Sequence, residues 1–255
     1  MGQLDGKVAV ITGAGTGLGA ATAKLFAREG AAVTLVGRRV EKLRDVATAI
    51  DGAGGRALVI PGDVSEPATA TRAAEDSIRE FGGIDVLVNN AGLHAAPYLL
   101  HETPLDEWDR FLAVDLTGPF LFTRAVLPSM MERRDGAIVN IGSMVALVGF
   151  QGSSAYAAAK GGLVSMTRTT AVDYAQYGIR ANCVCPGGME PVEYGNLTED
   201  QLARLHEAVE LAGGPLLNRL AHVDEVAQFL LTLVGPGGRS LTGAVIPYDG
   251  GFTAK

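Results

Sequence analysis

Tyr156 and Lys160 lie four residues apart in the segment AYAAAK, so a helix would place both side chains on one face. A tyrosine phenol normally titrates near ~10 and is a poor base at neutral pH, but a nearby ammonium group favours the phenolate and lowers the pKa. A tyrosine in such a setting can exchange a proton with a reacting oxygen. The spacing therefore predicts acid–base chemistry, with a paired surface tyrosine and lysine as the alternative.

A serine stands where it can join this pair. Ser143 follows the apolar run at residues 137–141 after a single glycine, Gly142. If the run is a strand, the Ser143 hydroxyl lies at the carboxyl edge of a sheet, where open α/β folds form their ligand crevices. From there it could hold the same reacting oxygen by a hydrogen bond.

A glycine-rich segment, residues 12–19 (TGAGTGLG), separates the first apolar run from a stretch with helical spacing. Glycines let such a turn tighten and let the backbone approach a pyrophosphate, whose charge then meets the positive end of the helix dipole. The position after a strand and before a helix makes the match more specific than the glycines alone. We expect a dinucleotide here, held by Gly13, Thr16, Gly17, Leu18 and Gly19.

The elements that must position these residues alternate along the chain. Apolar runs rich in valine and isoleucine predict strands at residues 7–12, 32–36, 57–60, 86–88, 137–141, 180–184 and 244–247. Helical spacing predicts helices near residues 18–29, 40–51, 66–80, 106–132, 154–177 and 222–234. The alternation predicts a single α/β domain over residues 1–255, with a doubly wound, Rossmann-type parallel sheet flanked by helices.

Composition restricts the function classes. The net charge of -7 argues against a nucleic-acid partner, which needs a basic face. We find no targeting segment and no apolar run near the roughly 18 residues of a membrane span, so we expect a cytoplasmic protein without a membrane partner. The four histidines are scattered and show no metal-ligand spacing, so no metal site is predicted.

Residues 188–215 interrupt the alternation before the last helix. This segment holds six acidic residues and one basic residue, Arg204. Long excursions beyond the carboxyl ends of strands often form lids over active sites. We predict a substrate lid, with a solvated helical surface that does not contact the substrate as the alternative.

Taken together, these motifs resemble those of the short-chain dehydrogenase/reductases over nearly the whole chain. The matching pieces are TGAGTGLG at residues 12–19, Asp63-Val64, NNAG at residues 89–92, Ser143 thirteen residues before Tyr156, Tyr156 with Lys160, Asn182 with Pro186-Gly187, and Asp249-Gly250-Gly251. The resemblance implies a seven-stranded sheet and an NAD(P)-dependent oxidoreductase for a secondary alcohol or ketone. It also implies a homotetramer or dimer formed through the two long helices.

The resemblance further implies a role for each matching residue. Tyr156 would be the acid/base, Ser143 would bind the substrate oxygen, and Lys160 would lower the tyrosine pKa and bind the nicotinamide ribose. The other cofactor contacts would be Asp63 with Val64 at the adenine, Asn90, Ala91 and Gly92 along the dinucleotide, and Pro186, Gly187 and Met189 at the nicotinamide ring.

Two positions depart from the family pattern. Asp115 stands where the family usually has an active-site asparagine, which is expected to act largely through its backbone carbonyl, by supporting a helix kink and a water bridge to the lysine. We keep Asp115 among the catalytic residues and expect its carboxylate to add negative charge near Lys160. Pro191 stands where the family often places a threonine against the nicotinamide amide.

The choice between NADP and NAD is predicted from the end of the second strand, residues 35–39 (LVGRR). NAD-preferring folds usually place an acid there to bind the ribose 2′-hydroxyl, but this chain has Gly37 followed by Arg38. A guanidinium can bind a 2′-phosphate through two hydrogen bonds. We therefore predict NADP. NAD is the alternative, because Glu41 could neutralise Arg38 and the glycine-rich turn has Thr16 where a second basic residue often stands.

Three functions remain open on the sequence. The first is a ketone or alcohol oxidoreductase, which includes a 3-oxoacyl thioester reductase if Arg133 and Arg134 form a basic patch for an acidic acyl carrier. The acidic segment favours a small free substrate instead. The second is a non-redox relative, such as a dehydratase or epimerase, and the third is a catalytically idle dinucleotide-sensing regulator. The joint presence of Ser143, Tyr156 and Lys160 counts against the third.

Overall fold

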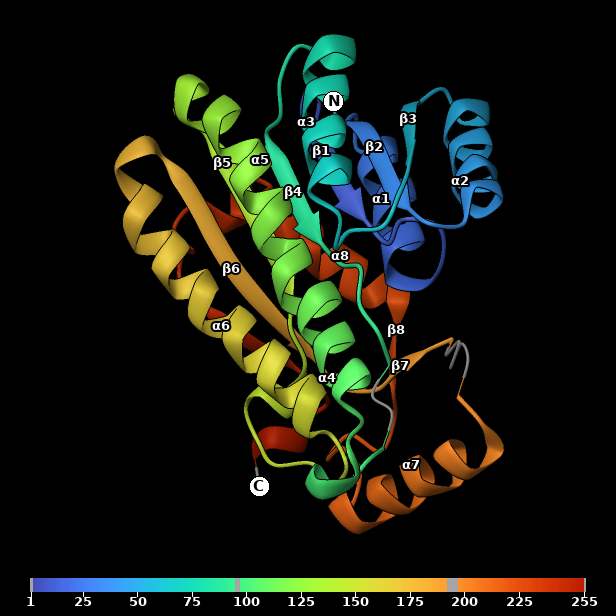
Figure 1. The fold of residues 1–255 in the computed structure, drawn as a ribbon. Coiled ribbons are helices and arrows are strands. Elements are labelled where there is room, and N and C mark those ends of the chain that lie inside the picture. The colour runs from blue at the N-terminus through green and yellow to red at the C-terminus, as the bar shows by residue number, and fades with distance from the viewer. Residues whose placement is uncertain (1, 95–96, 192–196, 255) are drawn as a thin grey trace.

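A parallel sheet of seven strands forms the centre of the computed structural model, which describes residues 2–94, 97–191 and 197–254 (Figure 1). The strands follow the order β3-β2-β1-β4-β5-β6-β9 across the sheet. They are β1 (Val8–Thr12), β2 (Ala32–Gly37), β3 (Arg56–Pro61), β4 (Val86–Asn89), β5 (Gly136–Ile141), β6 (Ile179–Pro186) and β9 (Val245–Tyr248). The order reverses between β1 and β4, which confirms the predicted doubly wound architecture.

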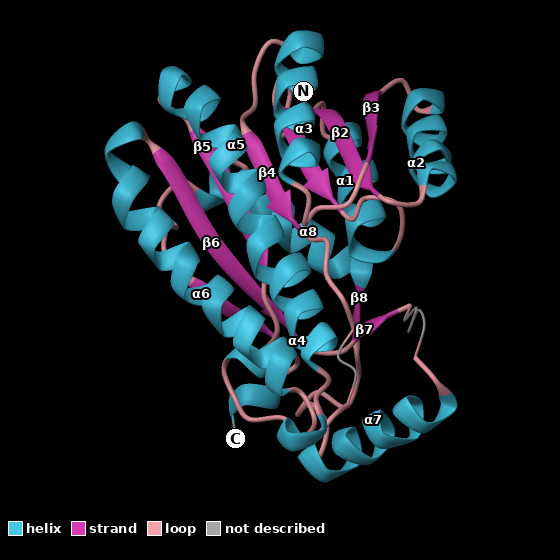
Figure 2. Cartoon of the chain, in the orientation of Figure 1, coloured by secondary structure: helices cyan, strands magenta, loops and turns pink. Residues whose placement is uncertain are grey.

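Helical layers cover both faces of the sheet (Figure 2). Helices α1 (Gly17–Arg28), α2 (Val40–Gly52) and α8 (Val223–Val234) lie on one face, and α3 (Pro67–Phe81), α5 (Gly118–Arg133) and α6 (Ser154–Tyr174) lie on the other. Phe26 and Leu230 are buried in the first layer, and Phe122 and Met130 in the second. Burial of each such side chain contributes about 1.5–3 kcal/mol, so both layers hold the strand ends in place.

The central strands are mostly apolar because both of their faces are covered. Every residue of β1 is buried, and its register pairs Val10 with Thr34 of β2 and with Leu87 of β4. The one polar member of this row, Thr34, shares a hydrogen bond of 2.7 Å with the buried Ser77 hydroxyl of α3. Continuous apolar strands of this kind are typical of parallel sheets.

The predicted helix near residues 106–132 is present but is not a uniform α-helix. It consists of α4 (Leu105–Leu112), a π-helical turn (Ala113–Thr117) and α5. Single π-helical turns within α-helices often occur at functional sites. Asp115 lies in this turn and is fully buried.

The same stretch, Leu105–Arg133, is long and apolar enough to cross a membrane when judged by length and composition. In this fold Phe122, Val126 and Met130 pack into the core beneath the sheet. The packing therefore accounts for part of its apolar character, since 44% of its most apolar window is buried.

Residues 188–215 contain elements that the sequence analysis did not assign. Met189–Glu190 forms β7, which pairs in parallel with β8 (Ala221–His222), and Glu199–Ala212 forms helix α7. A capping box was the available sequence signal for α7, because Thr198 and Gln201 exchange side-chain to backbone hydrogen bonds. Part of the predicted lid, residues 192–196, lies outside the described residues.

Candidate functional site

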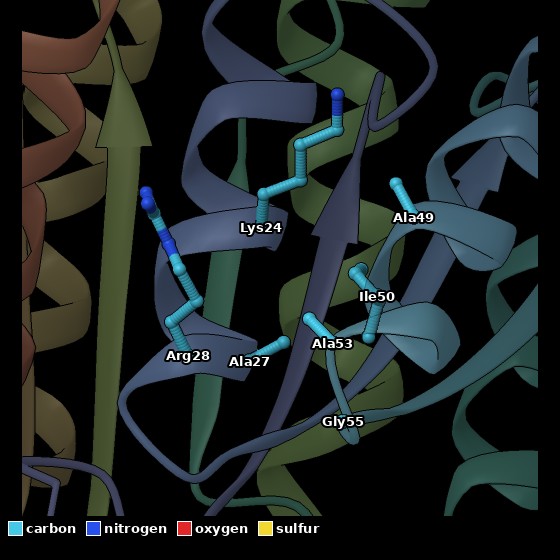
Figure 3. Close-up of a pocket in the computed structure, with 7 residues that line it drawn as sticks. All are labelled: Lys24, Ala27, Arg28, Ala49, Ile50, Ala53 and Gly55. Carbon is cyan, nitrogen blue, oxygen red and sulfur yellow. The ribbon is translucent and has the colours of Figure 1, made fainter.

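A cleft of about 820 Å³ opens at the carboxyl ends of the strands. Its volume is typical of cofactor and ligand sites, and open α/β sheets bind ligands at this edge. A second pocket, of about 200 Å³, lies between α1 and α2 (Figure 3). The described residues that line this smaller pocket include Lys24 and Arg28 but no acid, hydroxyl or thiol. The large cleft is therefore the candidate site.

The glycine-rich turn forms one end of the cleft. Gly13 and Gly17 have φ angles of 66° and 52°, in the left-handed region that other residues rarely adopt. A Cβ atom on Gly19 would lie only 2.2 Å from the Gly13 carbonyl oxygen, so α1 can pack here only with glycine at that position. The N-terminus of α1 favours an anion. These features fit the pyrophosphate of a dinucleotide.

Thr12 joins the ends of β1 and β4 beside this turn. Its hydroxyl oxygen accepts hydrogen bonds from the backbone N–H groups of Asn90 and Ala91, each at 3.0 Å. The Asn90 side chain donates to the Thr12 carbonyl oxygen at 2.9 Å. This network holds Asn90, Ala91 and Gly92 along the wall of the cleft.

Ser143, Tyr156 and Lys160 meet farther along the cleft. Ser143 follows β5, and the first turns of α6 carry Tyr156 and Lys160, as their spacing predicts. Ser143 and Tyr156 both line the cleft and interact through their side-chain oxygens, and Lys160 Nζ lies 5.7 Å from the centre of the Tyr156 ring. Phe111 packs edge-on against the Tyr156 ring, with 5.8 Å between ring centroids. The arrangement can exchange a proton with an oxygen held by Ser143.

The Lys160 ammonium has two partners on its buried side. Its Nζ donates to the Ile141 carbonyl oxygen at 2.8 Å and lies 3.0 Å from Asp115 Oδ1. The backbone N–H of Leu93 donates to Asp115 Oδ2 at 3.2 Å. The Asp115 carboxylate thus places negative charge beside Lys160, as expected, and its contact with the lysine is direct. The role expected for the Asp115 backbone carbonyl stays a prediction.

These contacts act on the proton affinity of the tyrosine in opposite directions. Burial raises the pKa of Tyr156 above its ordinary value, and Asp115 raises it further. The Lys160 ammonium lowers the tyrosine pKa, as predicted, but it does not overcome the burial. Burial disfavours the lysine charge, yet Asp115 and Tyr156 outweigh this effect and raise the pKa of Lys160.

Two arginines lie where β2 ends. The Arg38 side chain is 65% exposed, and its Nη1 lies 3.8 Å from an Asp63 carboxylate oxygen. Arg39 Nη2 donates to Thr16 Oγ1 at 2.8 Å. Arg39 thus brings a second cation to the glycine-rich turn, which the sequence analysis missed although Arg39 stands directly beside Arg38.

Glu41 does not neutralise Arg38 in this structure. Its carboxylate pairs with Arg44 at 2.8 Å, one helical turn farther along α2. The three atoms nearest to a Cβ atom on Gly37 would all belong to the Leu43 side chain, the nearest at 3.5 Å, so the position has room for a side chain.

Apolar side chains contribute to the cleft lining together with polar ones such as His94 and Gln201. Phe150 and Phe252 line it with ring centroids 6.4 Å apart, and Leu93, Met144 and Leu197 also contribute. Phe252 belongs to the C-terminal segment and lies about a hundred residues from Phe150 in the chain. No local sequence pattern pointed to this pair, because only the packed structure brings the two rings together.

Helix α7 also borders the cleft. Gln201 Nε2 donates to the Tyr98 hydroxyl oxygen at 3.0 Å, and Arg204 Nη1 lies 3.3 Å from a Glu102 carboxylate oxygen. These contacts join α7 to the loop that follows β4. Gln201 and His206 of α7 line the cleft, so this helix is in a position to contact a substrate.

Nearly all of the predicted site residues come together in the cleft. Its lining includes Gly13, Thr16, Gly17, Leu18, Arg38, Asp63, Val64, Asn90, Ala91, Gly92, Ser143, Tyr156, Lys160, Pro186, Gly187 and Met189. Gly19 and Asp115 are not among the described lining residues, because both are buried behind it. Pro191 also lines the cleft.

The basic patch suggested for Arg133 and Arg134 is wrong. Arg133 Nη2 lies 3.2 Å from a carboxylate oxygen of Asp85, immediately before β4. Arg134 donates to the Gln176 carbonyl oxygen, shortly before β6. Both arginines therefore lie at the amino ends of the strands, away from the mouth of the cleft.

The chain is similar to known proteins along nearly its whole length. The family profile described as short chain dehydrogenase matches residues 7–202. The cis-4-hydroxycyclohexanecarboxylate dehydrogenase of Sinomonas cyclohexanicum is 40% identical, with 97% of each chain covered. The meso-2,3-butanediol dehydrogenase of Serratia marcescens is 36% identical, covering 99% of this chain and 97% of the relative. The crystal structure of levodione reductase matches with a TM-score of 0.90 and 32% identity, covering 98% of this chain and 99% of that chain.

Proposed function

Because this chain belongs to the short-chain dehydrogenases and is an oxidoreductase acting on CH–OH groups, we propose that it transfers a hydride between NADP(H) and a small, apolar secondary alcohol or its ketone. The observation that carries this proposal is the continuity of the cleft. The cleft is lined by the turn that fits a pyrophosphate, by Ser143, Tyr156 and Lys160, and by an apolar group of side chains, Leu93, Met144, Phe150 and Phe252, which we call the apolar chamber.

In this proposal the side chains act on the oxygen of the substrate. The bound nicotinamide supplies or accepts the hydride at the substrate carbon. During ketone reduction Tyr156 donates its phenol proton to the carbonyl oxygen while the Ser143 hydroxyl holds that oxygen by a hydrogen bond. Lys160 stabilises the phenolate that remains, and alcohol oxidation reverses each proton step.

The proposal is tested with purified protein, NADPH or NADH, and a panel of ketones and alcohols, by following the absorbance of the reduced nicotinamide. Nucleotide binding is measured separately by calorimetry. Turnover of at least one apolar secondary alcohol or ketone is expected. Tight nucleotide binding without turnover of any member would reject the proposal and leave the non-redox and regulatory alternatives.

The preference for NADP(H) is supported by the two arginines at the end of β2. The last residue of β2 is Gly37, so no carboxylate stands at this position. Arg38 and Arg39 follow it, and both line the cleft near the glycine-rich turn. A 2′-phosphate placed beside the glycine-rich turn would meet these guanidinium groups, which bind phosphate better than they bind a hydroxyl.

A Gly37→Asp, Arg38→Ala double variant should shift the preference toward NADH. The change removes a charge-assisted hydrogen bond worth about 1.5–3 kcal/mol and adds a repelling carboxylate, so the ratio of kcat/KM for NADPH over NADH should fall about tenfold to a hundredfold. Arg44→Ala is the matched control, because it removes an exposed arginine of α2 that pairs with Glu41. Wild-type protein that uses NADH as efficiently as NADPH would refute the assignment.

The apolar chamber supports a compact substrate that is not attached to a carrier protein. Its lining of Phe150, Phe252, Leu93 and Met144 favours a hydrocarbon skeleton. The relative named for cis-4-hydroxycyclohexanecarboxylate makes ring alcohols a sensible start for the substrate panel. The position of Arg133 and Arg134 away from the cleft mouth gives no support for an acyl-carrier substrate.

We also propose that α7 acts as part of a substrate lid. Removal of the Gln201 to Tyr98 hydrogen bond by Tyr98→Phe, which leaves the capping box of α7 intact, should raise KM about threefold to tenfold, because a hydrogen bond of this kind contributes about 0.5–1.5 kcal/mol. Hydrogen exchange in α7 should slow when cofactor and substrate are both bound. Tyr174→Phe, at the end of α6, is the matched control, because it removes a tyrosine hydroxyl from a residue that is not among the described lining residues of the cleft. Unchanged exchange in α7 would leave the solvated-surface alternative standing.

We further propose a cytoplasmic homotetramer or dimer formed through the two long helices. Phe120 of α5 is 48% exposed and Val172 of α6 is 78% exposed. Apolar side chains at these positions are suited to burial in a subunit interface.

A further inference from the structure

Asp115 and Lys160 form a buried ion pair directly behind the catalytic tyrosine. Asp115 is 0% exposed and Lys160 is 4% exposed. The ammonium donates a hydrogen bond to the Ile141 carbonyl oxygen and forms an ion pair with Asp115, whose Oδ1 lies 3.0 Å from Nζ. Lys160 also lines the cleft beside Tyr156, and its Nζ lies 5.7 Å from the centre of the Tyr156 ring.

The local structure is built to allow this close contact. The π-helical turn carries Asp115, and Gly92 leaves the space that the carboxylate occupies. A Cβ atom on Gly92 would lie 2.7 Å from Asp115 Oδ1 and 3.4 Å from Lys160 Nζ. Any side chain at position 92 would therefore push the two charged groups apart or force the backbone to move.

The carboxylate changes the charge that the tyrosine experiences. A lysine ammonium alone would favour the phenolate, whereas an ammonium paired with a carboxylate has no net charge. The titratable groups that face the pair are Tyr156 on α6, His94 after β4, and the thiols of Cys183 and Cys185 on β6. Of the two members of the pair, Lys160 lowers the pKa of Tyr156 and Asp115 raises it.

We propose that the Asp115 carboxylate, through its ion pair with Lys160, keeps the phenol proton on Tyr156 and so favours ketone reduction over alcohol oxidation near neutral pH. This inference rests on the proposed function, and it concerns the relative rates of ketone reduction and alcohol oxidation. Ketone reduction requires a protonated Tyr156. The O–H bond of the phenol breaks and a new O–H bond forms on the former carbonyl oxygen. The carbonyl carbon gains the hydride, and the nicotinamide is oxidised. Alcohol oxidation requires the Tyr156 phenolate to accept the alcohol proton. Its rate should therefore rise only at a higher pH, where the phenol is deprotonated.

Asp115→Asn tests the inference, because it removes the negative charge but keeps the size of the side chain and an oxygen acceptor. The half-maximal rate of alcohol oxidation should occur at lower pH in the variant than in the wild type. Below the wild-type midpoint, oxidation should accelerate about tenfold relative to the wild type, since a nearby charge typically changes a proton affinity by at least that factor. Ketone reduction should decline at a correspondingly lower pH.

Asp109→Asn is the matched control, because it removes one carboxylate from the exposed surface of α4 and should leave both pH profiles unchanged. If Asp115→Asn does not fold, Asp115→Ser must shift the profiles in the same direction. Identical midpoints in a folded Asp115 variant and the wild type would overturn the inference.

A second measurement does not depend on turnover. The ultraviolet absorbance of tyrosinate is titrated in the wild type and in Asp115→Asn, each corrected with its own Tyr156→Phe version. The Tyr156 signal should appear at lower pH in the Asp115→Asn protein. If no alcohol or ketone is turned over, the proposed function fails, but this titration still decides whether Asp115 holds the proton on Tyr156.

Discussion

Tyr156→Phe should lower turnover about 10²- to 10⁴-fold, because it removes the group that donates and accepts the substrate proton. The phenylalanine ring keeps the edge-on contact with Phe111, so the fold and the cofactor affinity should remain close to those of the wild type. Turnover is measured by nicotinamide absorbance and cofactor affinity by calorimetry.

Tyr174→Phe is the matched control for this prediction. Tyr174 ends the same helix, α6, and its ring packs against Tyr177 with 6.3 Å between ring centroids. Its hydroxyl has no part in the proposed chemistry, so the control should keep wild-type turnover. If Tyr156→Phe keeps more than about a tenth of wild-type turnover, the activation barrier has risen by less than about 1.4 kcal/mol. Such a result would show that Tyr156 does not transfer the substrate proton.

Lys160→Met should both destabilise the fold and abolish most activity. It leaves the Asp115 carboxylate buried without its ammonium partner, and breaking a buried pair in this way typically costs about 3–5 kcal/mol. The free energy of unfolding is measured by denaturant titration. Turnover should fall at least about a hundredfold, because the phenolate of Tyr156 loses its stabilising charge.

The stability of Lys160→Met should depend on pH with a defined sign. Burial raises the pKa of Asp115, so the folded chain binds this proton more tightly than the unfolded chain does. Stability is then lost as the pH rises through the raised pKa and is regained on acidification toward the ordinary carboxyl range. If Lys160→Met is less stable than the wild type by the same amount at acidic and at neutral pH, the loss of stability does not come from an unpaired Asp115 carboxylate.

The double variant Lys160→Met, Asp115→Leu separates the two effects. Replacement of a whole buried ion pair by apolar side chains is often neutral or stabilising, so most of the lost stability should return. Activity should not return, because Tyr156 still lacks the ammonium. Recovery of activity together with stability would mean that Lys160 serves only the fold.

The sequence alone was sufficient for the features that depend on local spacing. The alternation of strand and helix predicted the doubly wound sheet, and the four-residue spacing placed Tyr156 and Lys160 on one face of α6. The glycine-rich turn was recognisable because a strand, a tight turn and a helix start follow one another within about ten residues of chain. Each of these patterns has a period or an order that the backbone geometry imposes on neighbouring residues.

Contacts between distant segments required the tertiary structure. The π-helical turn and Gly92 together bring the Asp115 carboxylate to Lys160, and no spacing along the chain encodes that approach. Arg133 lies at the amino ends of the strands, so it cannot form a basic patch at the cleft mouth. Phe252 belongs to the C-terminal segment, yet it packs near Phe150 in the cleft. Such positions depend on how whole elements pack, since burial and strand register bring side chains together irrespective of their separation in sequence.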